Sequence, residues 1–186
     1  MKITKELLRE KGACAAGYRD FLKEFPEEKY PDGVEYQDLL DCCAEKNFSY
    51  GSWLLSEFGR TDDVRRVDGD LITKKSIIFA GRLEVSGIIK AGCGIEAGEG
   101  IEAGCGIKAG WGIEAGCGIE AGEGIEAGWD IKAGCGIKAG WGIEAGWEFG
   151  IYAGLRVRIT SECRKIIAKT KPENIMCGEF VEAENE

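Results

Sequence analysis

The sequence contains no histidine, and only three of its 186 residues are proline. Histidine is the usual general base of enzymes and the commonest metal ligand, so its absence excludes Ser-His and Cys-His nucleophile pairs. Long apolar runs are also missing, because no segment reaches the ~18–20 residues of a transmembrane helix. The first residues, Met1 to Lys5, do not begin the apolar stretch of a secretory signal. We therefore expect a soluble, cytoplasmic protein.

Positive charge is scarce relative to negative charge. The 24 Lys and Arg residues stand against 33 Asp and Glu residues, which gives a net charge of −9 and an isoelectric point near 4.8. A protein that binds nucleic acid directly needs basic side chains that neutralise phosphates. The charge balance therefore argues against direct binding of nucleic acid, and the missing apolar runs argue against a membrane partner.

Glycine is the residue in excess, at 29 of 186 residues, and most of it lies between Gly69 and Gly154. In this region an apolar residue that is expected to point into the core recurs every six positions. A second residue that is expected to point inward follows it two positions later. The first row is Leu71, Ile77, Leu83, Ile89, Ile95, Ile101, Ile107, Ile113, Ile119, Ile125, Ile131, Ile137, Ile143, Phe149 and Leu155. The second row is Thr73, Phe79, Val85, every sixth residue from Ala91 to Ala145, Ile151 and Val157.

The central repeat unit is Ile-(Glu/Lys)-Ala-Gly-(Cys/Glu/Trp)-Gly. The alternation Ile-x-Ala has the period of a β-strand, and Gly-x-Gly suits a corner because glycine tolerates positive φ. A helix is excluded because two glycines per hexad would cost about 2 kcal/mol per repeat. Collagen is excluded because glycine does not recur at every third residue. The repeat therefore predicts a mainly β fold, a hexad-repeat β-solenoid.

Composition divides the chain into three regions. Residues 1–66 carry apolar stripes at helical spacing, interrupted by Pro26 and by the turn residues Pro31 to Gly33, with Gly59 as a helix stop. They predict a small helical N-terminal domain, a helical hairpin or three-helix cap. Residues 67–157 form the solenoid of about five turns. Residues 158–186 are expected to cap its C-terminal end, with a frayed tail from Glu182.

The number of hexads per turn decides which side chains stack. Turns of three hexads make a triangular β-helix, and turns of two hexads make a flatter coil that would pair opposite charges more often. We favour the triangle, because one Ile and one Ala per side fill a triangular interior more naturally than a two-layer sandwich. The handedness stays open.

The fifth position of each hexad lies between two glycines and is expected at an exposed corner. With three hexads per turn, Trp111, Trp129 and Trp147 stack into one ladder that Cys93 continues, and Trp141 lies at another corner with Cys105 and Glu123. Ring stacking alone could stabilise a corner. Exposed tryptophans that gather toward one end also mark interfaces, so we predict an interface at Trp111, Trp129, Trp141 and Trp147.

The residue after each isoleucine points outward and is charged. Its simplest role is to keep the solenoid surface solvated. With three hexads per turn the predicted columns are Glu84-Glu102-Glu120-Lys138, Lys90-Lys108-Glu126-Glu144 and Glu96-Glu114-Lys132. The runs of glutamate would give an acidic surface, and the predicted interface therefore also includes Glu84, Glu96, Glu102, Glu114 and Glu120.

Nine cysteines are present, yet no Cys-x-x-Cys motif occurs. The odd number and the missing secretory signal predict free thiols. Corner thiols project in parallel and would not converge on a tetrahedral metal, so no metal and no cofactor is expected. Neither a base nor a dipole that would activate a thiolate is indicated, and the protein is therefore predicted not to be an enzyme.

The hexad period resembles that of the hexapeptide-repeat acyltransferases. Their large and small inner positions come in the other order, however, and their chemistry uses a histidine base that this chain lacks. Ice binding is also excluded, because it requires flat rows of threonine and the solenoid offers only Thr73.

Two stretches of the chain resemble the polymer-forming bactofilins: Val67-Asp68-Gly69-Asp70-Leu71, and the segment from Gly81 to Ile89. This resemblance implies a triangular right-handed β-helix that assembles end to end, although a helical domain before the coil departs from the bactofilin pattern. A small acidic repeat coil with a helical cap is also similar in kind to the pentapeptide-repeat DNA mimics and acidic inhibitors of phages.

The sequence thus predicts a non-enzymatic protein-binding module. Its partner would be another protein. In the preferred interpretation the chain is an acidic phage-type inhibitor, and the partner is a nucleic-acid-handling defence complex of the bacterial host. The alternative is a bactofilin-like scaffold that self-associates, with a homodimer as its smallest form.

Overall fold

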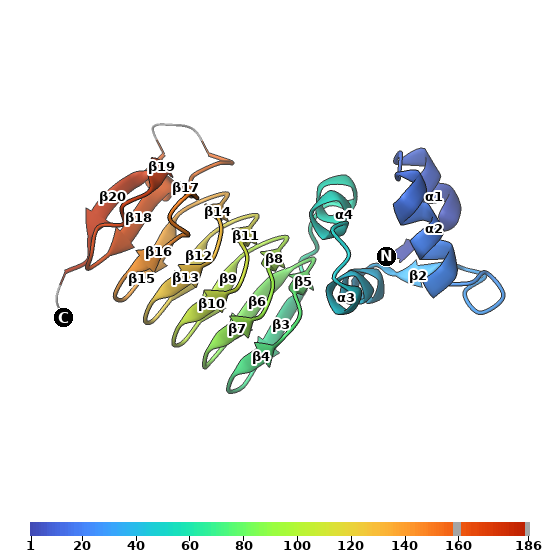
Figure 1. The fold of residues 1–186 in the computed structure, drawn as a ribbon, viewed down its shortest axis with the longest axis horizontal. Coiled ribbons are helices and arrows are strands. Elements are labelled where there is room, and N and C mark those ends of the chain that lie inside the picture. Colours follow the sequence, from blue (N-terminus) through green and yellow to red (C-terminus); the bar gives the residue numbers. More distant parts are fainter. Residues whose placement is uncertain (158–160, 185–186) are drawn as a thin grey trace.

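The computed structural model describes residues 1–157 and 161–184. It consists of a helical N-terminal domain followed by a β-solenoid, and the helices lie beside the first turns of the coil (Figure 1). The predicted fold class, a mainly β solenoid with a small helical domain, is confirmed.

The helical domain contains four short helices and a two-stranded antiparallel sheet. The first apolar stripe forms two helices rather than one, because the chain turns at Gly12 with a φ of +77°. The small sheet, β1 paired with β2, had no signal in the sequence. The elements are β1 (Lys2–Ile3), α1 (Lys5–Glu10), α2 (Ala15–Glu24), β2 (Val34–Glu35), α3 (Tyr36–Lys46) and α4 (Gly51–Phe58).

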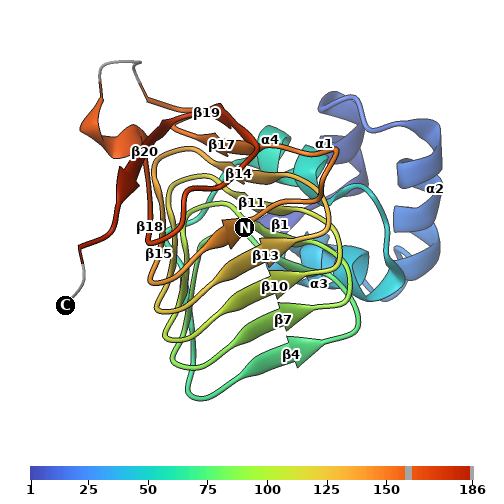
Figure 2. The same cartoon turned by 60° about the vertical axis from the view of Figure 1, so that its left-hand side comes forward.

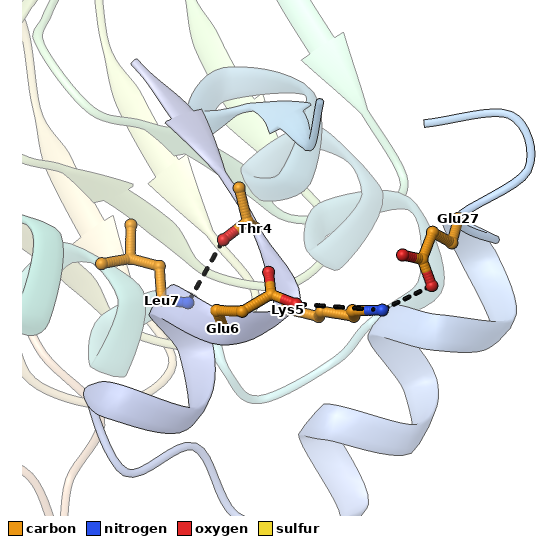
Figure 3. Close-up of polar contacts among 5 residues, drawn as sticks. All are labelled: Thr4, Lys5, Glu6, Leu7 and Glu27. Atoms are coloured by element: carbon orange, nitrogen blue, oxygen red, sulfur yellow. Dashed lines mark hydrogen bonds and ion pairs between the residues drawn. The ribbon is translucent and has the colours of Figure 1, made fainter. Parts of the chain in front are cut away.

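Local capping fixes the start of α1 and the end of α4. Figure 3 shows the start of α1, where the Thr4 hydroxyl accepts a hydrogen bond from the Leu7 amide at 3.2 Å and Lys5 pairs with Glu27 beyond α2. Helix α4 ends at Phe58, and the C-cap residue Gly59, with a φ of +77°, confirms the predicted stop. The buried Tyr36 hydroxyl donates to the Leu54 carbonyl at 2.9 Å and thereby ties α3 to α4.

The solenoid has three sheets of parallel strands, and each sheet forms one side of a triangle (Figure 2). Strands stack in register with a step of three hexads, as in the pairing of Ile107 with Ile89 and Ile125. The three-hexad turn is therefore confirmed and the two-hexad turn is wrong.

The three sheets divide the strands as follows. Sheet 1 contains β3 (Val64–Val67), β6 (Arg82–Val85), β9 (Ile101–Ala103), β12 (Ile119–Ala121), β15 (Ile137–Ala139), β18 (Lys165–Ala168) and β20 (Glu179–Glu182). Sheet 2 contains β4 (Leu71–Thr73), β7 (Ile89–Ala91), β10 (Ile107–Ala109), β13 (Ile125–Ala127) and β16 (Ile143–Glu144). Sheet 3 contains β5 (Ile77–Phe79), β8 (Ile95–Ala97), β11 (Ile113–Ala115), β14 (Ile131–Ala133), β17 (Ile151–Ala153) and β19 (Ile175–Cys177).

The core of the solenoid is built almost entirely from isoleucine and alanine. From Ile89 to Ile143 the isoleucines of the first row are at most 5% exposed, and the alanines that follow them are at most 8% exposed. These nearly identical rungs stack directly on one another, so each turn buries the apolar face of its neighbours.

The predicted inward row breaks after Ile143. Ile151 pairs with Ile131, so this turn is longer than three hexads by two extra residues. Phe149 and Leu155 consequently lie outside the core, 36% and 53% exposed, and their prediction as inward residues is wrong. These two residues keep the sixfold period of the sequence only by coincidence. The loop between β16 and β17 holds two extra residues, so the inward positions after it are shifted by two.

The glycines of the repeat serve a different purpose from the one expected. None of them in the Ile-x-Ala-Gly-x-Gly units adopts a positive φ. Instead, a Cβ on the first glycine would collide with the turn below: at Gly122 it would lie closer than 3.0 Å to the carbonyl oxygen of Gly104. The second glycine has room, since a Cβ at Gly124 would lie 3.6 Å from the nearest atom, and Asp130 occupies this position in one hexad.

The C-terminal segment continues the coil. Strands β18 and β20 extend sheet 1 and β19 extends sheet 3, which brings the coil to about six turns rather than five. Between β18 and β19, the amides of Lys169 and Thr170 both donate to the carbonyl of Trp141, at 2.8 and 3.3 Å. The tail that was predicted to fray comprises residues 182–186. Glu182 is the last residue of β20, and residues 185–186 lie outside the described part of the chain.

The side chain of Gln37 in α3 joins the helical domain to the solenoid. Its amide nitrogen donates to the Ile78 carbonyl at 2.9 Å, and its amide oxygen accepts from the Ala80 amide at 3.1 Å. Ile78 and Ala80 are buried and belong to the core of the helical domain. Gln37 therefore replaces a neighbouring strand at the free edge of β5, and the helices cover the start of sheet 3.

Candidate interaction surface

An aromatic column runs along the corner between sheets 2 and 3; we define it as Trp111, Trp129 and Phe149. The rings of Trp111 and Trp129 are 5.3 Å apart and 6° from parallel, and those of Trp129 and Phe149 are 5.9 Å apart and 23° from parallel. The corner backbone sets this spacing, because the Trp129 amide donates to the Trp111 carbonyl at 3.3 Å.

The predicted ladder contained Trp147 as its third member, and this is wrong. The two-residue insertion after β16 moves the ladder position from residue 147 to residue 149, so Phe149 takes the place. Trp147 lies in the loop instead and is 86% exposed. Sequence reasoning missed Phe149 because it assigned this residue to the core.

The corner position that precedes the aromatic column, Cys93, lies beneath the helical domain. Its carbonyl accepts a hydrogen bond from the Trp111 amide at 3.2 Å, so it belongs to the same corner. The Cys93 thiol donates to the Asn47 side chain at 3.6 Å, in the turn between α3 and α4. The aromatic column therefore starts at the edge of the helical domain and runs away from it along the coil.

The column is half exposed along its length. Trp111 is 41%, Trp129 is 48% and Phe149 is 36% exposed. Trp141 is 65% exposed and lies on the other border of sheet 2, in the corner column with Cys105 and Glu123 that was predicted. The predicted tryptophans thus do not form one patch; they border sheet 2 on both sides.

The predicted glutamates lie on two different sheets. On sheet 1, Glu84, Glu102 and Glu120 stack in register as predicted. Ion pairs terminate this row at both ends, from Arg66 to Glu84 at 2.8 Å and from Lys138 to Glu120 at 2.7 Å. On sheet 3, Glu96 stacks on Glu114. The acidic surface is therefore shorter and more neutralised than expected.

Glu96 lies at the junction with the helical domain. Burial raises the pKa of its carboxyl, the neighbouring charge of Glu114 raises it further, and a hydrogen bond from the Ser52 hydroxyl at 2.8 Å lowers it. Glu96 is partly buried and accepts the hydrogen bond from Ser52, which makes it unsuitable as part of an open acidic surface.

Sheet 2 carries an outward row that the prediction of site residues passed over. In register from β4 to β16 it reads Ile72, Lys90, Lys108, Glu126 and Glu144. Lys108 and Glu126 form an ion pair between exposed side chains. The signs of these charges change once, halfway along the row.

The cysteines are free thiols in the structure. Burial raises the pKa of the Cys43 thiol to about 12, and burial together with the thiols of Cys117 and Cys163 raises that of Cys135. The Arg60 guanidinium donates to the Cys117 sulfur at 3.2 Å and pairs with Glu99 at 2.8 Å. Within residues 1–157 and 161–184, no group of three or more Cys, Asp or Glu side chains is arranged to hold a metal ion.

The helical domain contains an apolar cavity of about 230 Å³ that the sequence did not reveal. Aromatic rings line much of it, including those of Phe21, Phe48 and Trp53. The Tyr50 hydroxyl at its wall donates to Asp20 at 2.9 Å. In the described part of the chain, no helix combines the length and the apolar character required to cross a membrane.

Comparison with known proteins gives a match at the N-terminal end of the chain. No curated protein sequence and no solved structure matches the chain significantly. The solenoid nevertheless has the general fold that the bactofilin resemblance implies. Residues 1–60, which end just before the first strand of the solenoid, match the family model described as the YdhT N-terminal domain.

Proposed function

We propose that the protein is a non-enzymatic binding module that contacts another protein molecule through the aromatic column. The observation that carries this proposal is the parallel stack of Trp111, Trp129 and Phe149, each at least a third exposed. Large aromatic rings are the side chains that contribute most binding energy in protein interfaces.

The surroundings of the column support an interface rather than mere stabilisation of a corner. Other corner positions of the same coil carry Cys105, Cys117, Glu99 or Glu123 and keep the same backbone hydrogen bonds. The fold therefore does not require aromatic rings at corners. Trp111, Trp129 and Phe149 share one corner and create a continuous apolar strip beside sheet faces whose outward residues are mostly charged.

A narrower hypothesis makes the partner a nucleic-acid-handling complex that is blocked by an acidic surface. The net charge of −9 and the row Glu84-Glu102-Glu120 support it. The cations that close this row at both ends weaken the resemblance to a run of phosphates. The aromatic column is therefore the better supported contact surface.

End-to-end assembly, as in bactofilins, has less support. Gln37 already occupies the edge of β5 at the N-terminal end of the coil. At the same end Arg65 pairs with Leu83 and thus stands at an inward position of β3, where it is exposed. A charge at an inward position of an edge strand opposes the addition of another strand to that edge.

The test compares Trp129→Ala and Phe149→Ala with Tyr152→Ala, which removes an aromatic ring from the face of sheet 3. Truncation of an interface anchor costs about 2 kcal/mol or more, which is a loss of affinity above tenfold. We expect this loss for the two column variants, measured as self-association and as recovery of a defined partner from the native host. Equal association of all three variants and the wild type would refute the proposal.

A further inference from the structure

The outward row of sheet 2 has an order of charges that is opposite in sign to its own reverse. From β7 to β16 it reads Lys90, Lys108, Glu126 and Glu144, and these residues are held in strict register. Successive rungs are about 4.8 Å apart. Consider a second copy rotated by a half turn about an axis parallel to the strands, midway between β10 and β13, and placed against this face. Every lysine of one copy then lies opposite a glutamate of the other.

We propose that the partner of the aromatic column is a second copy of this chain, bound face to face and antiparallel through sheet 2. Lys90 then faces Glu144 of the second copy, and Lys108 faces Glu126. The inference rests on the proposed function and names its partner. A parallel arrangement in the same register would place like charges opposite one another at all four rungs, which is unfavourable.

The other two sheets lack this complementarity. On sheet 1 the order Arg66, Glu84, Glu102, Glu120, Lys138 is symmetric, so the same rotation would place like charges together. On sheet 3 the first outward residue, Ile78, is buried by the helical domain. Sheet 2 is therefore the side of the triangle that suits a twofold pairing.

The same rotation brings the aromatic residues together. It preserves the strand direction, so the corners between sheets 2 and 3 of both copies lie along one edge of the interface. Trp111 of one copy then approaches Trp129 of the other. Along the opposite edge, Trp141 meets Gly87, because the corner column there reads Gly87, Cys105, Glu123, Trp141. The largest side chain of one copy thus faces the residue without a side chain in the other.

The face of sheet 2 is open in the described part of the chain. Lys90, Lys108, Glu126 and Glu144 are all exposed, and Ile72 at the start of the row is 62% exposed. The helical domain packs on β5 and lies to one side of the strands of sheet 2, as Figure 2 shows. An isologous contact of this kind is the commonest form of homodimer.

The first test uses two charge variants that disrupt the match in opposite ways. Lys90→Glu/Lys108→Glu makes the row entirely acidic, and Glu126→Lys/Glu144→Lys makes it entirely basic. Sedimentation equilibrium should show that each variant dimerises at least tenfold more weakly than the wild type, and that an equimolar mixture recovers dimers. Self-association of both variants at wild-type strength would overturn the proposal, as would a mixture that stays monomeric while both variants keep the wild-type circular dichroism.

A second measurement uses the unmodified chain and determines the orientation. A carbodiimide joins lysine to carboxylate without a spacer. Residues 90 and 144 of one copy are three rungs, roughly 14 Å, apart, which is too far for such a link within one chain. A Lys90–Glu144 link in the dimer band therefore supports the antiparallel pairing. A dimer band without this link overturns it.

The two sets of variants separate the two proposals. If Trp129→Ala weakens association and the charge variants do not, the column carries association without the pairing of sheet 2, and the dimer proposal fails alone. If the charge variants act and Trp129→Ala does not, sheet 2 forms the dimer without the column, and the proposed function fails.

Discussion

The two regions of this molecule obtain their structure in opposite ways. The helical domain depends on residues that occur once, such as the capping Thr4, the turn at Gly12 and the junction residue Gln37. The solenoid depends on one rule applied repeatedly, with an isoleucine, an alanine and a glycine in fixed positions. A repeated rule makes the core predictable, and between Ile89 and Ile143 one turn differs from another mainly in its outward charges and corner residues.

The largest expected effect follows from the register of the repeat. Inserting one residue after Gly122 reverses the inward and outward sides of all later strands up to the next loop. We expect the turns after β12 to unfold, measured as loss of amide protection in β13 to β17. The matched control inserts one residue after Glu148, in the loop that already holds two extra residues, and should leave the turns before β16 protected. Equal protection in both variants would contradict the register.

The next effect separates the two glycines of a hexad. Gly122→Ala forces a Cβ against the carbonyl of Gly104, whereas Gly124→Ala meets only ordinary contacts. We expect a loss of about 3 kcal/mol or more in the free energy of unfolding for the first. The second should change it by less than about 1 kcal/mol. Chemical denaturation measures both, and similar losses would show that close stacking is not the reason for the first glycine.

A smaller effect tests the junction between the two regions. Gln37→Ala leaves the Ile78 carbonyl and the Ala80 amide without their side-chain partner, at a cost of about 1–3 kcal/mol. We expect faster hydrogen exchange at Ala80, with β12 unaffected. The control is Asp41→Asn, which changes the other partner of Gln37 but keeps a hydrogen-bond acceptor for it. Unchanged exchange at Ala80 in Gln37→Ala would show that Gln37 does not hold this edge.

The smallest effect concerns Glu96. Because burial raises the pKa of this carboxyl, the folded chain binds the proton more tightly than the unfolded chain, and stability falls as the pH rises through this range. Glu96→Gln should therefore stabilise the fold slightly at pH 7, by less than about 1 kcal/mol, measured by chemical denaturation. The difference should vanish toward pH 4, and a variant less stable than the wild type at pH 7 would contradict the assignment.

Much of the solenoid could be predicted because its signals are periodic. The corner positions follow once Ile-x-Ala is recognised as a strand, and the columns of charges follow from the further choice of three hexads per turn. Phe149 and Leu155 were misplaced because a two-residue insertion left the sequence period intact while it shifted the stacking. The reason for the first glycine was also hidden, because close approach of stacked backbones depends on a residue three hexads away.

The helical domain could be predicted only in outline. Its helices follow apolar spacing and turn residues, but the cavity lined by Phe21, Phe48 and Trp53 arises from the packing of several helices. The junction through Gln37 is a tertiary contact, which no local pattern indicates. The charge order of sheet 2 was visible in the sequence, yet its meaning depends on knowing which residues share a face.

Whether the aromatic corner is the surface of association can be decided by sedimentation equilibrium of the wild type beside Trp111→Ala/Trp129→Ala, with Tyr152→Ala as the control. We predict a concentration-dependent dimer for the wild type and the control. The double variant should associate more than tenfold more weakly, while its melting temperature changes little. A double variant that dimerises like the wild type would contradict the claim that this protein associates through the aromatic corner.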